Sequence, residues 1–407
     1  MADAASLQRN PASSSVPELV RGVPAGLELG LRNFWYPIIQ GSEVPAGTPV
    51  PVTCLNEDLV VFRDSRGAPQ VLFDRCPHRY VKLSVGRVLG DELQCSYHGL
   101  RFAGGGDCTL IPWEQETTPA VRKKLCVRSY RAAEVGGLIW AYLGEEDKFP
   151  APPLEESLPE ELFQPDKFVH FLLPTEIWDA NWLLVIDGSD AYHAVTLHVE
   201  SQQHDAVLQY LDKEALAELE AKKAEGKRAV PLADRRVQIV ETDGHGLRGI
   251  SVDLDGNHLE HGHKLAPLRG ERFNLPAIVT NALRPVENAA PYVSRLFQVP
   301  INYNQTRMFR YAAWRAETEE DRTRLKTHFE KVVRPRQLKT SAEDRMMAAA
   351  GGDLVESRAN ELLLSPDRDM TRIRRRMAAA FVAQKLQGSR TGDGETTPSQ
   401  ATLVFPV

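Results

Sequence analysis

Two short segments, Cys76-Pro77-His78-Arg79 and Cys95-Ser96-Tyr97-His98-Gly99, decide how this sequence is interpreted. Each places one cysteine and one histidine two or three residues apart, and sixteen residues separate the first histidine from the second cysteine. A tight loop brings both of its side chains to one metal centre only at such a short spacing. The proline and the final glycine are well suited to shaping these turns. The pattern predicts two metal-binding loops that face each other.

The four candidate ligands, Cys76, His78, Cys95 and His98, suit a Rieske [2Fe-2S] centre. In such a centre two cysteines hold one iron and two histidines hold the other. A Cys2His2 zinc site uses the same ligand types, but a zinc finger groups a cysteine pair and then a histidine pair. Each segment here mixes one cysteine with one histidine. The order of ligands therefore favours the iron–sulfur cluster, with structural zinc as the alternative.

The composition is that of an ordinary globular protein with room for two domains. The chain has 407 residues, of which 42% are hydrophobic and 26% charged, and chains beyond roughly 250 to 300 residues divide into domains. No stretch approaches the roughly 20 apolar residues needed to cross a bilayer. The first residues lack the basic start and apolar run of a secretory signal. We therefore expect a cytoplasmic protein with no membrane-spanning segment.

Charge, cysteine content and glycine patterns argue against three further classes. A net charge of −6 argues against nucleic acid binding, because phosphate recognition needs clustered Lys and Arg. The five cysteines are an odd number in a chain without an export signal, which disfavours a disulfide framework. No Gly-x-Gly-x-x-Gly pattern follows a predicted strand, so no NADH or flavin site is predicted and electrons must come from outside the chain.

A proline-rich, acidic segment from Phe149 to Pro165 marks the best domain boundary, which we place near residue 155. Short apolar runs separated by turn residues precede it and indicate a small all-β domain. These runs are Val50–Val52, Leu59–Phe62, Val71–Phe73 and Leu138–Leu143. We expect a leader over residues 1–28, the all-β domain over 29–155, a second domain over 156–387 and a tail over 388–407.

Helical and strand-like patterns alternate beyond the boundary, which predicts a mixed second domain and an α+β fold for the chain. The helical patterns are Asp179–Leu184, Lys213–Lys227, Glu317–Val333 and Asp369–Leu386. The strand-like runs are Gln238–Glu241, Arg295–Pro300 and Met308–Trp314.

A second candidate site lies in the pattern Asp-x-x-His-x-x-x-x-His formed by Asp190, His193 and His198. Residues five apart on a regular helix point about 140° apart, so the helix must distort or end between the two histidines. Two histidines and one carboxylate leave a face of an iron ion open for O2 and substrate. Taken alone, the pattern favours ordinary histidines, because motifs this short occur by chance. The cysteine–histidine segments upstream reverse that preference.

Both patterns resemble those of the ring-hydroxylating oxygenases, the family of Rieske non-heme iron enzymes. The likeness extends from Leu29 to about Met377 but is specific at the two motifs. The opening Leu29 to Pro37 looks most like the trimeric group of carbazole dioxygenases and demethylases. Val81 and Tyr97 stand where the Rieske subunits of respiratory complexes carry an extra cysteine in each loop, which favours the oxygenase branch.

The resemblance implies a role for each candidate residue. Cys76, His78, Cys95 and His98 would bind the [2Fe-2S] cluster, and His193 and His198 would bind a mononuclear Fe(II). Asp190 would link the two metal sites by a hydrogen bond to a Rieske histidine of a neighbouring subunit. The carboxylate ligand is expected late in the second, helix-grip-like domain. Asp344 of the Glu343-Asp344 pair is the first choice, Asp353 the alternative and Asp187 a weaker one.

The same resemblance implies a terminal oxygenase that uses O2 to hydroxylate a small aromatic or heterocyclic compound, as a mono- or dioxygenase of aromatic hydrocarbon catabolism. An O- or N-demethylating monooxygenase is the alternative within the family. Electrons would come from a ferredoxin, an NAD(P)H-dependent reductase or both, and the chain would form a homotrimer. A Rieske electron carrier and a zinc-stabilised binding protein are the alternatives outside it.

Overall fold

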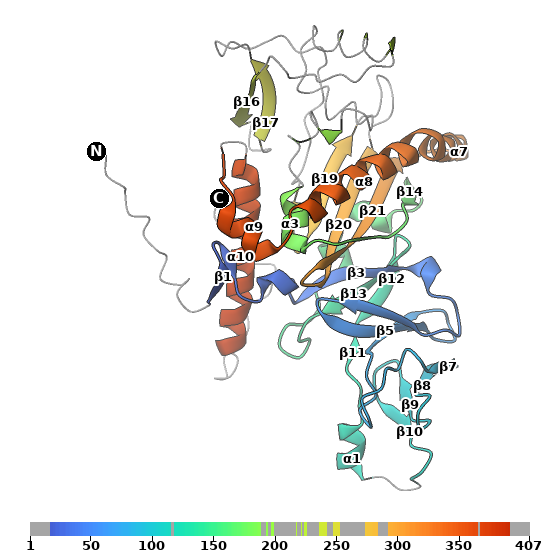
Figure 1. Ribbon diagram of the computed structural model, residues 1–407. Helices are drawn as coiled ribbons and strands as arrows, with labels where there is room; N and C mark the ends of the chain where they lie inside the picture. Colours follow the sequence, from blue (N-terminus) through green and yellow to red (C-terminus); the bar gives the residue numbers. More distant parts are fainter. Residues whose placement is uncertain are drawn as a thin grey trace.

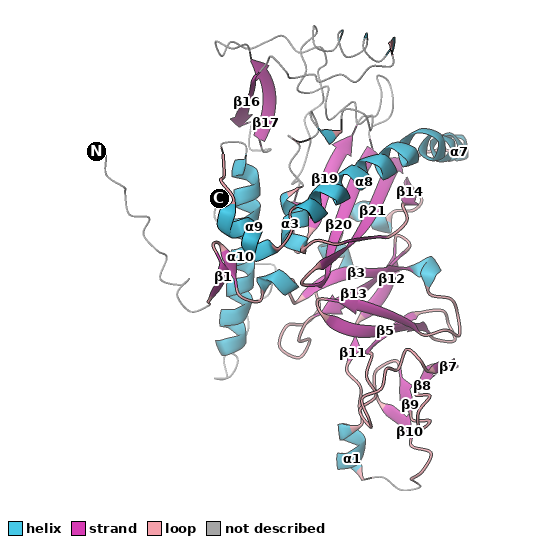
Figure 2. Cartoon of the chain, in the orientation of Figure 1, coloured by secondary structure: helices cyan, strands magenta, loops and turns pink. Residues whose placement is uncertain are grey.

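The computed structural model describes residues 17–114, 118–188, 193, 197–198, 217, 221, 224–225, 236–241, 247–252, 273–283, 292–364 and 367–390. Small β-sheets make up one end of the molecule, and a larger sheet covered by helices makes up the other (Figures 1 and 2). In the described part of the chain, no helix is long and apolar enough to span a membrane.

Three small antiparallel sheets form the N-terminal half. Their strand orders are β12-β13-β3, β11-β6-β5-β4 and β10-β9-β8-β7. The strands are β3 (Phe34–Gln40), β4 (Val50–Cys54), β5 (Glu57–Arg63), β6 (Pro69–Phe73), β7 (Arg87–Leu89), β8 (Glu92–Gln94), β9 (Arg101–Ala103), β10 (Cys108–Leu110), β11 (Ser129–Tyr130), β12 (Ala132–Val135) and β13 (Leu138–Leu143). Every residue of β13 is buried, as its unbroken apolar sequence requires.

Short elements precede and connect these sheets. They are β1 (Glu18–Val20), β2 (Val23–Pro24), η2 (Leu27–Leu29), η3 (Gly41–Glu43), α1 (Pro119–Lys124), α2 (Leu154–Ser157) and η4 (Glu160–Phe163). The small sheet β7–β10 and α1 lie at the end of the molecule farthest from the large sheet (Figure 1).

The C-terminal half is built on a six-stranded antiparallel sheet of order β14-β21-β20-β19-β18, with β15 also paired to β21. Its strands are β14 (Phe168–Leu172), β15 (Glu176–Trp178), β18 (Phe273–Asn274), β19 (Ile278–Leu283), β20 (Tyr292–Asn302) and β21 (Gln305–Arg315). A separate pair joins β16 (Arg236–Glu241) and β17 (Leu247–Val252). The helices are α3 (Trp182–Asp187), α7 (Glu319–His328), η5 (Phe329–Val333), α8 (Arg334–Ala350), α9 (Leu354–Asn360) and α10 (Arg368–Arg390).

The long helix over the large sheet differs from its prediction. The sequence pattern ended this helix at Val333, but helical backbone continues through the π-helical turn η5 into α8, to Ala350. Pro335 lies in the first turn of α8, where a missing N–H and a fixed φ are tolerated. Pro335 therefore does not end the helical backbone, and the second helical segment carries Asp344.

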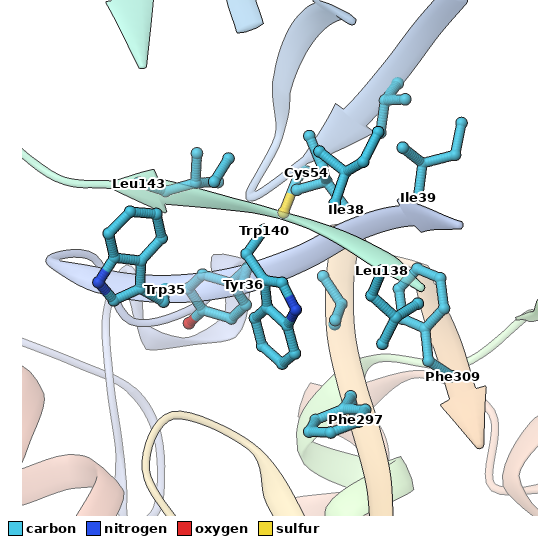
Figure 3. Close-up of a cluster of buried hydrophobic side chains, with 14 of the residues drawn as sticks. Trp35, Tyr36, Ile38, Ile39, Cys54, Leu138, Trp140, Leu143, Phe297 and Phe309 are labelled. Carbon is cyan, nitrogen blue, oxygen red and sulfur yellow. The ribbon is translucent and has the colours of Figure 1, made fainter. Parts of the chain in front are cut away.

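One hydrophobic core joins the two halves of the protein. The buried ring of Trp140 on β13 packs edge-on against Phe297 on β20, with ring centroids 5.2 Å apart and an interplanar angle of 89°. Ile38 of β3 and Phe309 of β21 belong to the same buried cluster, and Figure 3 shows the side chains of the small and large sheets meeting there. The sheets thus position each other through apolar contact.

A tight turn reinforces this contact with main-chain hydrogen bonds. Leu55 and Asn56, between β4 and β5, both have positive φ, 52° and 59°, as a type I′ hairpin turn requires. Their N–H groups donate to the carbonyl oxygens of Pro300 (2.9 Å) and Ile301 (2.8 Å) on β20. The turn therefore docks a small sheet onto the large one without using a side chain.

The predicted α+β class, with an all-β N-terminal part and a mixed C-terminal part, is confirmed. The strand-like runs lie in β4, β5, β6, β13, β16, β20 and β21, and the helical run Asp369–Leu386 lies in α10. The helical run Asp179–Leu184 overlaps α3 only in its second half, because α3 begins at Trp182. The surface helix expected over Lys213–Lys227 lies almost entirely outside the described residues.

We predict that Phe297→Ala lowers the free energy of unfolding by about 3 to 5 kcal/mol, the cost of removing a buried aromatic side chain. Denaturant unfolding followed by tryptophan fluorescence measures it. Val121→Ala, which truncates an exposed side chain of α1, serves as the control and should change stability by less than about 0.5 kcal/mol. Equal effects of the two substitutions would show that the shared core does not hold the halves together.

Candidate metal centres

Two backbone loops position the first group of candidate ligands. In the first loop the Cys76 N–H donates to Val81 O (2.8 Å) and the Tyr80 N–H to Cys76 O (2.7 Å). In the second, the Cys95 N–H donates to Leu100 O (2.8 Å). Tyr80 (φ 60°) and Gly99 (φ 77°) each take the left-handed conformation that closes its loop. Each cysteine is thus fixed at the start of a short turn.

The cysteines of the two loops point inward and the histidines lie at the surface. Cys76 and Cys95 are buried, each 1% exposed, whereas His78 is exposed and His98 half-buried. The two imidazole rings meet edge to face with centroids 4.6 Å apart. Burial raises the pKa of the Cys76 thiol to about 11, and the neighbouring Cys95 thiol adds to the rise. Such buried thiols become thiolates only beside a compensating cation, as metal ligands do.

The four loop side chains are not drawn together as the ligands of a single ion would be. Tetrahedral ligands at Zn–S distances of about 2.3 Å lie within about 4 Å of one another. Among the described residues, the one group of three or more candidate ligands whose atoms all lie within 4.8 Å is His193, His198 and Asp344. The four loop residues form no such group, as expected where cysteines and histidines hold different irons.

The second group forms where α3, the segment after it and α8 meet. Asn181 caps α3: its Oδ1 accepts from Leu183 N–H (3.0 Å) and its Nδ2 donates to Glu28 O (3.0 Å). Beyond the end of α3, the Leu197 N–H donates to His193 O (2.7 Å), directly before His198 in the sequence. The two imidazole rings lie with centroids 4.9 Å apart.

Asp344 completes this group from α8. Its Oδ1 lies 2.9 Å from His198 Nε2 and 3.4 Å from His193 Nε2. Burial raises the pKa of the Asp344 carboxyl, but the hydrogen bonds from His193 and His198 outweigh that and bring it to about 2. Asp344 is therefore ionised at neutral pH, as a carboxylate metal ligand must be. Two imidazoles and one carboxylate suit a mononuclear iron.

Glu343 orients one of these histidines, a role that sequence reasoning missed. Its Oε2 lies 2.8 Å from His198 Nδ1, on the opposite side of the ring from Asp344. A metal-binding histidine commonly donates its second N–H to a carboxylate, which fixes the tautomer and the ring orientation. With a metal bound, a proton on Nδ1 would leave the Nε2 lone pair free for the ion, on the side of the ring where Asp344 lies. The adjacent Glu-Asp pair in the sequence was the available signal.

Other candidate residues lie elsewhere or outside the described chain. Asp353 caps α9, accepting from Val355 N–H (2.8 Å) and Tyr303 Oη–H (3.0 Å). Asp187 pairs with Arg374 (2.9 Å) and Arg358 (2.7 Å). The structure thus brings together His193, His198 and Asp344 and neither alternative carboxylate. Asp190 lies outside the described residues, as do the histidines at 258, 261 and 263.

A cavity of about 440 Å³ opens beside the second group. His193 and Asp344 line it, together with Gln298 and Arg310. The rest of the described wall is mostly apolar and comes from α3, α8 and the large sheet; it includes Trp178, Val185, Leu296, Met308 and Met347. The volume and the apolar wall with a few polar groups are typical of a small-molecule site.

Comparison with known proteins places the chain in a class. Residues 34–131 match the Rieske [2Fe-2S] domain family. The 3-chlorobenzoate-3,4-dioxygenase oxygenase subunit of Comamonas testosteroni is 36% identical over 193 residues, 46% of this chain and 42% of that protein. The carbazole 1,9a-dioxygenase terminal oxygenase of Novosphingobium sp. KA1 superposes with a TM-score of 0.62 at 22% identity, over 87% of this chain and 94% of that one. A carbazole-bound oxygenase and ferredoxin complex of carbazole 1,9a-dioxygenase gives a TM-score of 0.62 at 22% identity, covering 91% and 95%.

The chain therefore contains a Rieske [2Fe-2S] domain, in the segment where the two cysteine–histidine loops lie. Its fold is similar to that of the carbazole 1,9a-dioxygenase terminal oxygenase, in line with the resemblance of its motifs to those of the ring-hydroxylating oxygenases. The match spans less than half the length of the curated relative.

We predict that a thiol-specific maleimide labels Cys126 alone in the native protein and all five cysteines after unfolding. Cys126 is exposed, whereas Cys54, Cys76, Cys95 and Cys108 are buried, and burial raises the pKa of Cys54 to about 12, which removes the reactive thiolate. Mass spectrometry of labelled peptides reads the result. Cys126→Ser should abolish native labelling, and labelling of Cys76 or Cys95 in the native state would contradict the buried loops.

Proposed function

We propose that this protein is the terminal oxygenase of a Rieske non-heme iron system, which uses O2 and externally supplied electrons to oxygenate a small aromatic or heterocyclic compound. One observation carries the proposal: a single chain combines a Rieske domain with a His-His-Asp group beside a cavity. An electron carrier would need the first feature but not the second, and a zinc-stabilised binding protein would need neither.

In this proposal Cys76, His78, Cys95 and His98 hold the [2Fe-2S] cluster, and His193, His198 and Asp344 hold one iron. The cluster supplies single electrons, and the iron supplies a site for O2 beside the substrate. The chain's own part is to hold these ligands and shape the site. Glu343 keeps the His198 ring in one orientation, and the apolar wall excludes water and packs against an aromatic body.

We infer that electrons pass between subunits of a head-to-tail homotrimer and enter it from a ferredoxin, an NAD(P)H-dependent reductase or both. Within one chain, the sheet β12-β13-β3 lies between the small sheet β7–β10, which neighbours the cluster loops, and the helices α3 and α8 beside the His-His-Asp group (Figure 1). A heterologous contact that closes into a ring can place one subunit's cluster beside its neighbour's iron site. Exposed aromatic side chains at the cluster loops, Tyr80, Tyr97 and Trp113, offer a contact surface for such an arrangement.

We predict that anaerobically purified protein holds about three irons per chain, two in the cluster and one at the second site. Asp344→Ala should reduce this number to about two and leave the Rieske absorption and EPR signals of the dithionite-reduced protein unchanged. Asp353→Ala is the matched control. It should weaken the cap of α9 by about 1 kcal/mol and retain about three irons.

Two results would contradict the proposal. Stoichiometric zinc with no visible absorption would favour a zinc-stabilised binding protein. A Rieske signal with two irons in the unaltered protein, and no further loss in Asp344→Ala, would favour an electron carrier.

A further inference from the structure

Arg310 and Arg358 both carry buried side-chain nitrogens that lack a hydrogen-bond partner in the described structure, but Arg310 has no carboxylate within hydrogen-bond distance. Arg310 lies on β21, is 5% exposed, and its Nε and Nη2 atoms are buried without a hydrogen-bond partner in the described structure. Arg295 and Arg358 are also largely buried, but each reaches a carboxylate at 2.7 Å, on Glu161 and Asp187. A buried cation is costly unless it is paired and hydrogen-bonded.

The acids nearest to Arg310 are engaged with other groups. Asp344 Oδ2 lies 3.8 Å from Arg310 Nη2, beyond the roughly 2.7 to 2.9 Å of a charge-assisted hydrogen bond, while Asp344 Oδ1 faces the two histidines. Glu176 Oε2 accepts from Trp178 Nε1 (2.8 Å) and Ser341 Oγ (2.7 Å). The guanidinium therefore keeps bonding capacity that these carboxylates do not use.

The Arg310 side chain also borders the cavity beside the His-His-Asp group. Arg310 lines the cavity together with His193 and Asp344, and its guanidinium lies over the Trp178 ring, 5.7 Å from the ring centroid. That stacking holds the planar guanidinium group in place. Apart from Arg310 and His193, the described wall offers no cationic side chain. One fixed cation in a largely apolar cavity is suited to a ligand with one anionic end.

We propose that the cavity selects a small organic anion, a carboxylate or sulfonate on an apolar ring, and that Arg310 binds its charged end. This inference rests on the proposed function, since it names the substrate class of the same site. The guanidinium fork matches two oxygens of such a group. The apolar wall then takes the ring, which lies beside His193 and Asp344 because these residues share the cavity with Arg310.

Calorimetric titration of the anaerobic holoprotein tests this inference without turnover. Benzoate and benzenesulfonate are the anionic probes, and benzamide is the neutral probe of the same size as benzoate. We expect at least one anion to bind at least about tenfold more tightly than benzamide, the effect of one charge-assisted hydrogen bond. Benzamide binding as tightly as both anions, or no binding of either anion, would overturn the proposal.

Variants assign the effect to Arg310. Arg310→Met keeps an unbranched apolar stem, removes the guanidinium and should weaken anion binding at least about tenfold, with about three irons and the Rieske signal retained. Arg310→Lys, which keeps the charge but loses the fork, should give an intermediate loss and serves if the methionine variant does not fold. Arg315→Met, on the exposed end of the same strand, should bind like the unaltered protein.

The outcomes also separate this inference from the proposed function. Unchanged anion binding in Arg310→Met, or loss of the third iron from that variant, would overturn the inference and leave Arg310 as a partner of Asp344. Anion binding that depends on Arg310 in a protein without a third iron would instead refute the oxygenase and keep the anion site.

Discussion

The packing of Trp140 against Phe297 is the contact on which the rest of the structure depends. It joins the sheet β12-β13-β3 to the large sheet within one apolar core. Cys76 and Cys95 lie in a neighbouring cluster of buried residues. Main-chain hydrogen bonds from the Leu55-Asn56 turn to β20 fix the same junction. A core of this kind keeps the two centres apart within a chain, and the proposed assembly of subunits follows from that separation.

A single helix supplies most of the chemistry at the second centre. On α8, Glu343 contacts His198 Nδ1, Asp344 contacts His198 Nε2, and Met347 and Ala348 line the cavity one turn further on. The histidines come from the segment after α3, whose start is anchored by Asn181. The geometry of the site therefore depends on how α8 crosses the sheet. The site combines the His-His-Asp group, an apolar cavity wall and the buried Arg310.

Local patterns in the sequence were enough to predict part of this account. The spacing of the cysteines and histidines in the two loops is a local pattern, and it identified the Rieske segment. Apolar runs such as Leu138–Leu143 are also local, and they identified the strands of the all-β part. Asp344 was chosen, ahead of Asp353 and Asp187, because the resemblance to the oxygenases implies a Glu-Asp pair late in the second domain. Helix α8 was missed because the predicted helix ended at Val333, although a proline in the first turn of a helical segment is tolerated. Arg310 and Glu343 were missed because only the folded sheet and helix show what they face.

Anomalous X-ray diffraction from crystals of the purified protein, recorded at the iron and zinc absorption edges, tests the central claim most directly. If the chain holds two metal-binding sites of different kinds, we expect two iron positions between the loops of Cys76 and Cys95. We also expect one iron position among His193, His198 and Asp344. A zinc signal between the loops, or no metal beside Asp344 in iron-loaded protein, would contradict the account.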